Sequence, residues 1–239
     1  MAGPSEHVVR SYDQELRRLT SLLTDMGGIV ESQVSLAARA ILQHDADAAT
    51  MVVESDPRVD ALEREVEQFV IQMLALRQPM ADDLRHIVAG LKIAADLERM
   101  GDYATNVAKR SIVLNQFSLP FSMAGVSHMA QLVQQNLKTI VDAIGEDDAA
   151  KAVLVWNSDQ PIDEIYNTIF RELITYMMED PRSITPCTHL LFIAKNLERI
   201  GDHATNIAEN LYYAVTGETL NTARPKGDNS PYAVVRQRE

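Results

Sequence analysis

The amino-acid sequence predicts an all-α protein built from two similar three-helix bundles that lie side by side. Helical periodicity runs through most of the 239 residues, and Gly and Pro gather mainly between the periodic stretches. The segment DLERMGDYATNVAKR at 96–110 recurs as NLERIGDHATNIAEN at 196–210, with nine of fifteen positions identical. Segments 41–62 and 144–165 are also similar, at nearly the same offset. A repeat of about 100 residues is too long for a small solenoid unit and fits a duplicated three-helix bundle.

The first repeat covers residues 1–117. Its first helix is expected over 6–44, where apolar residues recur at helical spacing. The second helix is expected over 46–77 and ends before Pro79, because proline cannot continue a helix. The third helix, over 81–117, contains the first copy of the repeated segment.

The second repeat covers residues 121–217 and follows a candidate linker, FSLPFSMAG, at 117–125. Its second helix should end before Pro181. Residues 218–239 mix Gly, Pro and charged residues, which predicts a mobile tail. The three helices of this repeat are expected over 125–144, 148–179 and 186–215.

Two prolines, Pro57 and Pro161, fall inside the predicted second helix of each repeat. Either the helix kinks at the proline, or Asp56 and Ser158 cap a new helix with proline in its first turn. The sequence leaves both interpretations open.

Composition narrows the range of functions. The net charge of −12 argues against nucleic-acid binding, which needs clustered Lys and Arg, and favours cations or basic protein surfaces as partners. The single cysteine, Cys187, excludes an internal disulfide and agrees with a reducing cytoplasm. We find no signal peptide and no run of about eighteen apolar residues, so any link to a membrane is expected to come through a partner.

Four pairs of carboxylates stand four residues apart, two pairs in each repeat: Glu98/Asp102, Asp56/Asp60, Glu198/Asp202 and Asp159/Asp163. The pairs of the repeated segment lie opposite the apolar face of their helix. Like charges at this spacing weaken a helix by roughly a few tenths of a kcal/mol, so helix stability does not explain them. Pairs on neighbouring helices could give one cation four or more oxygen ligands, which suits Mg, Mn, Fe or Ca.

A second interpretation of the acidic pairs stays open. Stripes of carboxylates opposite a core are commonly solvated surface, and Arg99 and Arg199 could neutralise them in weak surface ion pairs. Recurrence of the same residues in both repeats speaks against this interpretation. Gly101 and Gly201 also recur, and since a mid-helix glycine costs about 1 kcal/mol relative to alanine, they predict the close approach of another helix.

Motifs of several enzyme classes are absent, and we therefore expect no enzymatic activity. The sequence contains no GxxxxGK[ST], GxGxxG or GxSxG motif. The Glu-x-x-His step of di-iron bundles has Gly101 or Gly201 at the histidine position. For His203 we expect partial exposure or a hydrogen bond rather than a metal-binding role.

The motifs LERMGDYATNVAK and LERIGDHATNIAE, together with RQPMADDLRHI and TYMMEDPRSI, resemble the PhoU family of phosphate-signalling proteins over nearly the whole chain. The resemblance implies a cytoplasmic, homodimeric regulator of phosphate uptake. Such a protein would act as an adaptor between the ATPase of a phosphate ABC transporter and a sensor histidine kinase, and would repress the starvation response when phosphate is plentiful.

The resemblance also implies metal ligands. Some family members bind iron or zinc clusters through an Asp/Glu-x-x-x-Asp motif, which maps onto Glu98/Asp102 and Glu198/Asp202 and, more loosely, onto Asp56/Asp60 and Asp159/Asp163. Iron, zinc or another divalent metal is thus the implied cofactor. Independently of the resemblance, Arg99, Arg199, Asn106 and Asn206 lie close to these carboxylates on their helices and are candidates to support them. A helical protein that binds a metal cluster in a storage or enzymatic role is the alternative function.

Overall fold

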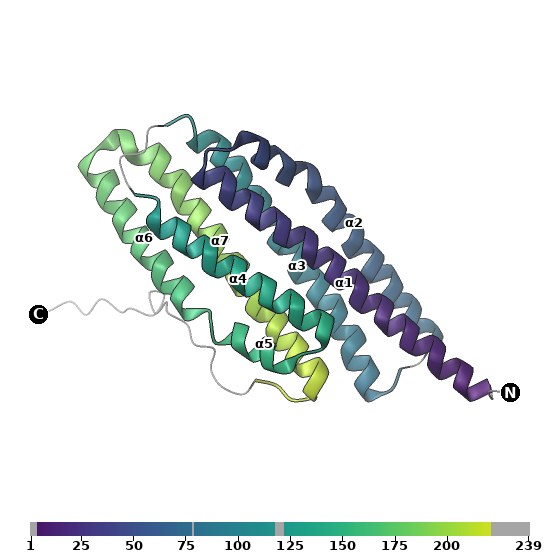
Figure 1. Cartoon of the computed structure of the whole chain (residues 1–239). Coiled ribbons are helices and arrows are strands. Elements are labelled where there is room, and N and C mark those ends of the chain that lie inside the picture. The colour runs from purple at the N-terminus through teal and green to yellow at the C-terminus, as the bar shows by residue number, and fades with distance from the viewer. Residues whose placement is uncertain (1–3, 78, 118–121, 221–239) are drawn as a thin grey trace, which may run out of the picture.

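The computed structural model describes residues 4–77, 79–117 and 122–220, and in these ranges every regular element is helical (Figure 1). The elements in chain order are α1 (Pro4–Leu42), α2 (Ala46–Arg77), α3 (Ala81–Leu114), α4 (Ala124–Glu146), α5 (Ala149–Trp156), α6 (Gln160–Glu179), the short 3-10 helix η1 (Pro181–Ser183) and α7 (Ile184–Thr216). The prediction of an all-α fold is confirmed.

Helices α1, α2 and α3 pack against one another as the first bundle, and α4 to α7 form the second. The two bundles lie side by side in Figure 1, as predicted. They meet along α3 and α7, and also where α1 packs on α4. Contacts of Asp96 with His203 and of Arg110 with Phe192 show that α3 and α7 run antiparallel, because the residue number rises along one helix as it falls along the other.

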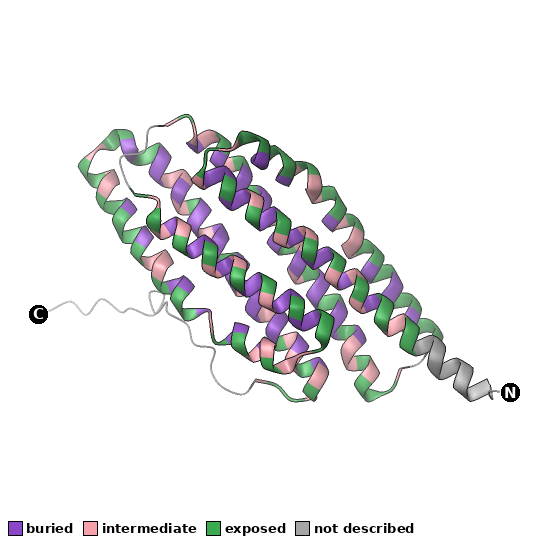
Figure 2. Cartoon of the chain, viewed as in Figure 1, coloured by how far each residue is buried: buried purple, intermediate pink, exposed green. Residues whose placement is uncertain are grey.

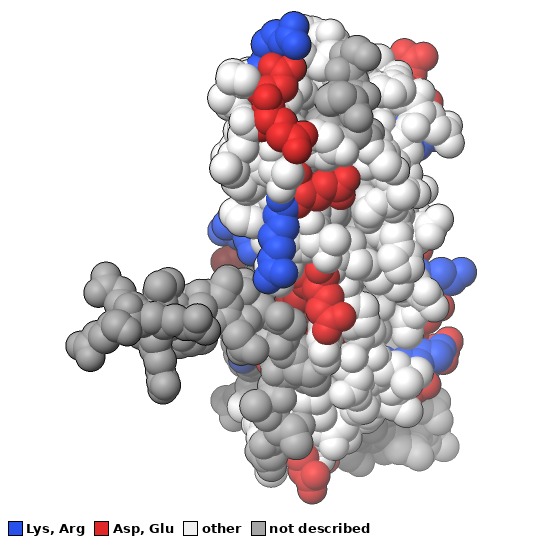
Figure 3. Space-filling view, turned by 90° about the vertical axis from the view of Figure 1, so that its left-hand side faces the viewer, with Lys and Arg blue, Asp and Glu red and all other residues white. Residues whose placement is uncertain are grey.

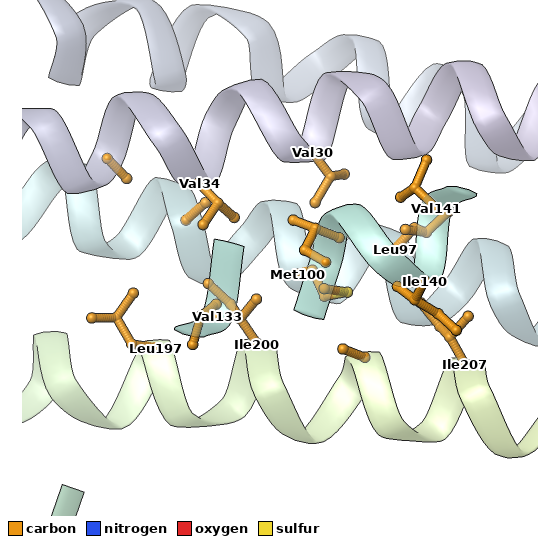
Figure 4. Close-up of a cluster of buried hydrophobic side chains, with 14 of the residues drawn as sticks. Val30, Val34, Leu97, Met100, Val133, Ile140, Val141, Leu197, Ile200 and Ile207 are labelled. Atoms are coloured by element: carbon orange, nitrogen blue, oxygen red, sulfur yellow. The ribbon is translucent and has the colours of Figure 1, made fainter. Parts of the chain in front are cut away.

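The apolar core continues from one bundle into the other. Val30 and Val34 of α1, Leu97 and Met100 of α3 and Ile140 of α4 are all buried and lie together with side chains of α7 (Figure 4). Figure 2 shows that the buried stripes of these helices face inwards, while exposed residues cover the outside. The two repeats therefore share one interior.

The predicted single helix over 148–179 is wrong, because the chain forms α5 and α6 with a break between them. In the break, the side chains of Asn157 and Ser158 donate hydrogen bonds to backbone carbonyls of the preceding turn, which competes with helix continuation. Pro161 then lies in the first turn of α6, where a missing N–H does no harm.

Helix α2, in contrast, runs unbroken through Pro57. The position that corresponds to Asn157 is Glu54, and glutamate is the better helix former. Of the two interpretations of the prolines, a new start therefore holds only in the second repeat. Its N-cap position is Asp159, one residue after the predicted Ser158.

The linker prediction falls partly on residues 118–121 and the tail prediction mostly on 221–239, which lie outside the described residues. The boundaries of the two repeats at 117 and 121 thus stay predictions. None of the helices in the described ranges has an apolar stretch long enough to cross a membrane.

Candidate functional site

The eight predicted carboxylates form two clusters, one in each bundle. The first acidic cluster joins α2 and α3 and consists of Asp56, Asp60, Glu98 and Asp102. The second acidic cluster joins the start of α6 to α7 and consists of Asp159, Asp163, Glu198 and Asp202. In each bundle the fold thus brings pairs from neighbouring helices together, because the second and third helices of each repeat pack against each other.

Carboxylates of the first cluster are half-buried, and their charges repel one another. Burial raises the pKa of Glu98, and the charges of Asp102, Glu63 and Asp60 raise it further. Burial also raises the pKa of Asp56, and the neighbouring charges of Asp102 and Asp60 add to this. A cation on this face would relieve this repulsion.

Two side chains oppose this repulsion in the first cluster. The hydroxyl of Thr105 in α3 donates a hydrogen bond of 3.1 Å to Asp56 in α2, which lowers the pKa of that carboxyl. Arg99 lies 3.7 Å from Glu98 and 3.9 Å from Asp102, distances that make only weak ion pairs at its exposed position. Arg199 is placed differently, with its guanidinium 5.5 Å from the ring of Tyr103 in the other bundle.

The second cluster is more deeply buried than the first. Only 1% of Asp159, 5% of Asp163 and 7% of Glu198 is exposed. One oxygen of Glu198 accepts a hydrogen bond of 2.6 Å from Lys195, while its other oxygen is buried and finds no hydrogen-bond partner among the described residues. Burial raises the pKa of Glu198, Lys195 lowers it, and Asp202 and Asp163 raise it again.

The repeated glycines lie where other helices approach the third helix of each repeat closely, namely α1 and α2 at Gly101 and α6 at Gly201. A Cβ at Gly101 would lie 3.0 Å from the side-chain oxygen of Gln33 and 3.5 Å from Val59. A Cβ at Gly201 would lie 3.1 Å from Ile162. The prediction of close helix approach at both glycines is confirmed, and it explains how carboxylates on neighbouring helices come together.

Several residues at the site were not predicted from the sequence. Lys195 stands three residues before Glu198, a spacing that could have indicated the ion pair. The partner of His203 is Asp96, whose carboxylate lies 2.7 Å from the imidazole, and the expected hydrogen bond is confirmed. Because these two residues are 107 positions apart, no local pattern could identify the pair.

The two supporting asparagines lie one turn beyond the carboxylates of α3 and α7. Asn106 is exposed and Asn206 is half-buried. Each asparagine comes four residues after the aspartate of its pair. Its role at the site stays a prediction.

The donor set of both clusters is suited to hard cations, since all its ligand atoms are oxygens. The unpartnered buried oxygen of Glu198 is an acceptor that a cation would satisfy. In the described parts of the chain, however, no three His, Cys, Asp or Glu side chains are arranged so that they could hold a metal ion. The chemistry fits a metal, the arrangement is not a ready-made site, and metal binding stays a prediction.

Apolar side chains are exposed beside the carboxylates on the same helices. Leu84, Val88 and Leu91 lie on the face of α3 that carries Glu98 and Asp102, as the helical spacing of these five residues shows. Exposed apolar residues along the same helices as the second cluster are Phe170, Ile174 and Met178 of α6 and Ile184 and Phe192 of α7, and some of them lie about 21 Å from the carboxylates at the helical rise of 1.5 Å per residue. Figure 3 shows the side on which α6 lies, where charged side chains are scattered among uncharged ones.

The comparisons with known proteins agree with the duplicated fold. The family model for the PhoU domain matches twice, at residues 23–111 and 126–211. A phosphate-specific transport system accessory protein PhoU homolog from Caulobacter vibrioides (strain NA1000 / CB15N) is 52% identical over 94% of this chain and 98% of its own.

Solved structures show the same architecture. The crystal structure of PhoU from Pseudomonas aeruginosa has a TM-score of 0.84 and 41% identity, and covers 87% of this chain and 100% of its own. The structure of the phosphate transport system regulatory protein PhoU from Streptococcus pneumoniae has a TM-score of 0.80 and 29% identity, over 88% and 100% of the respective chains.

Proposed function

Because the chain belongs to the PhoU family, we propose that it regulates phosphate uptake as an accessory protein of a phosphate-specific transport system. The strongest support is that the PhoU domain model matches the chain twice. In addition, a relative named PhoU homolog is similar to this chain over nearly the whole length of both proteins. The relative is named as an accessory protein and the solved Streptococcus pneumoniae structure as a regulatory protein, which favours regulation over catalysis.

In finer detail, the protein is a cytoplasmic adaptor that contacts both the transporter ATPase and a sensor histidine kinase. When phosphate is plentiful it limits uptake and represses the starvation response. The phosphate signal would shift which of the two complexes is populated, through a difference in affinity between two states. The proposed protein forms a homodimer and carries out no enzymatic step.

The working surface in this proposal is the face formed by the first acidic cluster, the partly exposed Asp202 of the second cluster and the apolar residues beside them. Protein interfaces commonly combine an apolar centre with a polar rim. The apolar stripe of Leu84, Val88 and Leu91 lies on the face of α3 that carries Glu98 and Asp102, and on α6 the exposed Phe170 follows Asp163 by two helical turns. With a net charge of −12, the chain also favours basic partner surfaces.

The first test replaces Glu98, Asp102, Glu198 and Asp202 by alanine and measures phosphatase expression in phosphate-rich medium. We expect derepression of the starvation response, because the two acidic clusters lose four carboxylates, three of them partly exposed. A matched variant loses four exposed carboxylates from α1 and α4 instead, namely Asp13, Asp25, Asp142 and Glu146, and should repress normally. Circular dichroism must show that both variants are folded.

Unchanged repression in the first variant would contradict a role for the acidic clusters. Contact with neither the ATPase nor the kinase in a binding assay would contradict the adaptor itself.

Metal binding is the second candidate, and the unpartnered oxygen of Glu198 favours it. When bound, a divalent cation would supply positive charge between the helices and so join carboxylates that otherwise repel one another. Elemental analysis of the purified parent and of the four-alanine variant belongs to the same experiment. Iron, zinc or manganese retained by the parent and lost from the variant would support this role, and equal metal content would assign the metal elsewhere.

A further inference from the structure

A groove of about 540 Å³ lies between α1 and α3, where the ends of α4 and α7 close it. It is separate from both acidic clusters. Its floor is apolar and includes Leu19, Leu23, Ile93, Leu211 and Ala214. A groove of this size with an apolar floor can bind a few side chains of an extended or helical segment.

The rim of this groove is more acidic than basic. Asp82, Asp83 and Asp147 line it, against Arg17 and His86. Asp82 is already paired with Arg85 at 2.9 Å, so Asp83 and Asp147 are the rim carboxylates that favour a basic occupant. The charge of the rim favours an occupant that combines apolar side chains with arginine or lysine.

The chain itself leaves the described fold beside this groove. Leu211 and Ala214 of α7 form part of the floor, and α7 ends soon afterwards at Thr216. Gly217 turns the chain with a φ of 73°, next to the side chain of Arg85, and Leu220 packs on the core. Whatever follows Leu220 therefore begins close to the rim.

The sequence beyond Leu220 has the composition that the groove favours. In a chain of net charge −12, the nineteen residues 221–239 carry four basic residues and only two acidic ones. The segment YAVVRQR at 232–238 combines Tyr232 and two valines with Arg236 and Arg238. The residues between Leu220 and this segment can span about 40 Å at the roughly 3.3–3.6 Å per residue of an extended chain, more than the groove requires.

We propose that residues 232–238 bind in this groove of the same molecule. Tyr232 and the two valines cover the apolar floor, and the arginines lie beside the aspartates of the rim. A partner that uses a basic segment to enter the groove would first have to displace this one. The proposal rests on the groove and on the sequence, and it does not depend on the proposed regulatory function.

Disulfide trapping in the full chain tests the proposal. Ser21 lines the groove, and Ser35 is an exposed serine about 21 Å further along α1 at the helical rise of 1.5 Å per residue. With oxidised glutathione as the oxidant, we expect S21C/V235C to cross-link at least about ten times faster than the control pair S35C/V235C, because binding raises the local concentration of the segment at the groove. Cys187 is buried and stays in place.

Charge reversal separates a docked segment from a merely nearby one. R236E/R238E should bring the two cross-linking rates close together, whereas R224E/K226E should leave their ratio unchanged. Equal rates for the two cysteine pairs would overturn the proposal, as would a ratio that R236E/R238E does not alter. Cross-links mainly between molecules, with a rate that falls on dilution, would also overturn it, because the segment would then bind a second copy.

Discussion

Glu198 differs in environment from Glu98, its counterpart in the first repeat. Its side chain is 9% exposed and pairs with Lys195, whereas that of Glu98 is 21% exposed and lies near Arg99. Burial raises the pKa of both carboxyls, which means that the folded state disfavours their ionised form. Burying these two carboxyls therefore lowers the stability of the folded state at neutral pH. Such a loss of stability is expected where a residue serves binding.

Replacing Glu198 by glutamine should change how stability depends on pH. A raised pKa stabilises the folded parent below the pKa of the unfolded chain, and this contribution is lost as the pH rises through the folded-state pKa. The glutamine variant lacks this loss, so the difference between its unfolding free energy and that of the parent should rise as the pH increases above the ordinary glutamate pKa of about 4.3. Urea unfolding at several pH values measures it.

The same substitution at Glu179, exposed at the end of α6, controls for the loss of one charge. A stability difference between the Glu198 variant and the parent that stays constant with pH would contradict the raised pKa.

At this scale the sequence predicted which carboxylates pair and that glycines lie beside them. It could not predict how deeply Asp159 and Asp163 are buried, because their burial depends on the packing of α6 against α7. The contact of Asp96 with His203 could not be predicted either, because it depends on how two helices that are far apart in the sequence pack against each other. Pattern identifies residue types on a helix face, and tertiary packing determines their environment.

Among the helices, the break between α5 and α6 shows where local pattern fails. Ser55 and Ser158 hold equivalent positions in the two repeats, and each donates a hydrogen bond to the carbonyl three residues earlier. Only the helix of the second repeat is broken there. The additional hydrogen bond of Asn157, where the first repeat has Glu54, separates the two cases. Both outcomes were compatible with the spacing of the prolines, so the sequence left them open.

Adjacent glycines in α1 offer a test of the contact between α1 and α4. A methyl group at Gly27 would lie 2.7 Å from Val141, whose branched side chain cannot easily move away, whereas Gly28 has open space. We expect Gly27→Ala to destabilise the protein by about 1–3 kcal/mol through overpacking. Gly28→Ala should stabilise it by up to about 1 kcal/mol through helix propensity.

Chemical denaturation of both alanine variants measures these changes in the free energy of unfolding. Since the two sites are neighbours on one helix, each serves as the control for the other. Equal effects at both would mean that α1 and α4 do not approach closely at Gly27.

The whole molecule should unfold as one unit, because the two bundles share a core. Trp156, the only tryptophan, lies in the second bundle and reports on it by fluorescence. Met73→Ala removes a side chain of the first bundle that is only 2% exposed, and should cost about 2–5 kcal/mol. The fluorescence transition of Trp156 should shift with the circular dichroism transition, although the mutation lies in the other bundle.

Met51→Ala is the matched control, since Met51 lies on the same helix and is 52% exposed. It should leave both transitions nearly unchanged. Separate transitions in the Met73 variant, with that of Trp156 unshifted, would show that the bundles fold independently.

The architecture was largely predictable at this scale, because duplication is visible in the sequence and a three-helix unit follows from its length. The antiparallel packing of α3 against α7 could not be predicted, because the apolar face of a helix does not determine the direction in which a second helix packs on it. The residues along this seam, such as Tyr103 and Arg199, therefore gained their contacts only from the structure.

Tyr103 and His203 hold the same position in the two repeats, and their rings contact each other with centroids 5.5 Å apart. Equivalent residues that meet in this way mark an approximate two-fold axis through the seam. A polypeptide with only one repeat could pair with a second copy of itself about the same axis, and every residue there would then face its own counterpart. The present chain has the geometry of such a dimer fused end to end. Fusion removes the requirement that both sides be identical, so a tyrosine can face a histidine and the two acidic clusters can differ in burial.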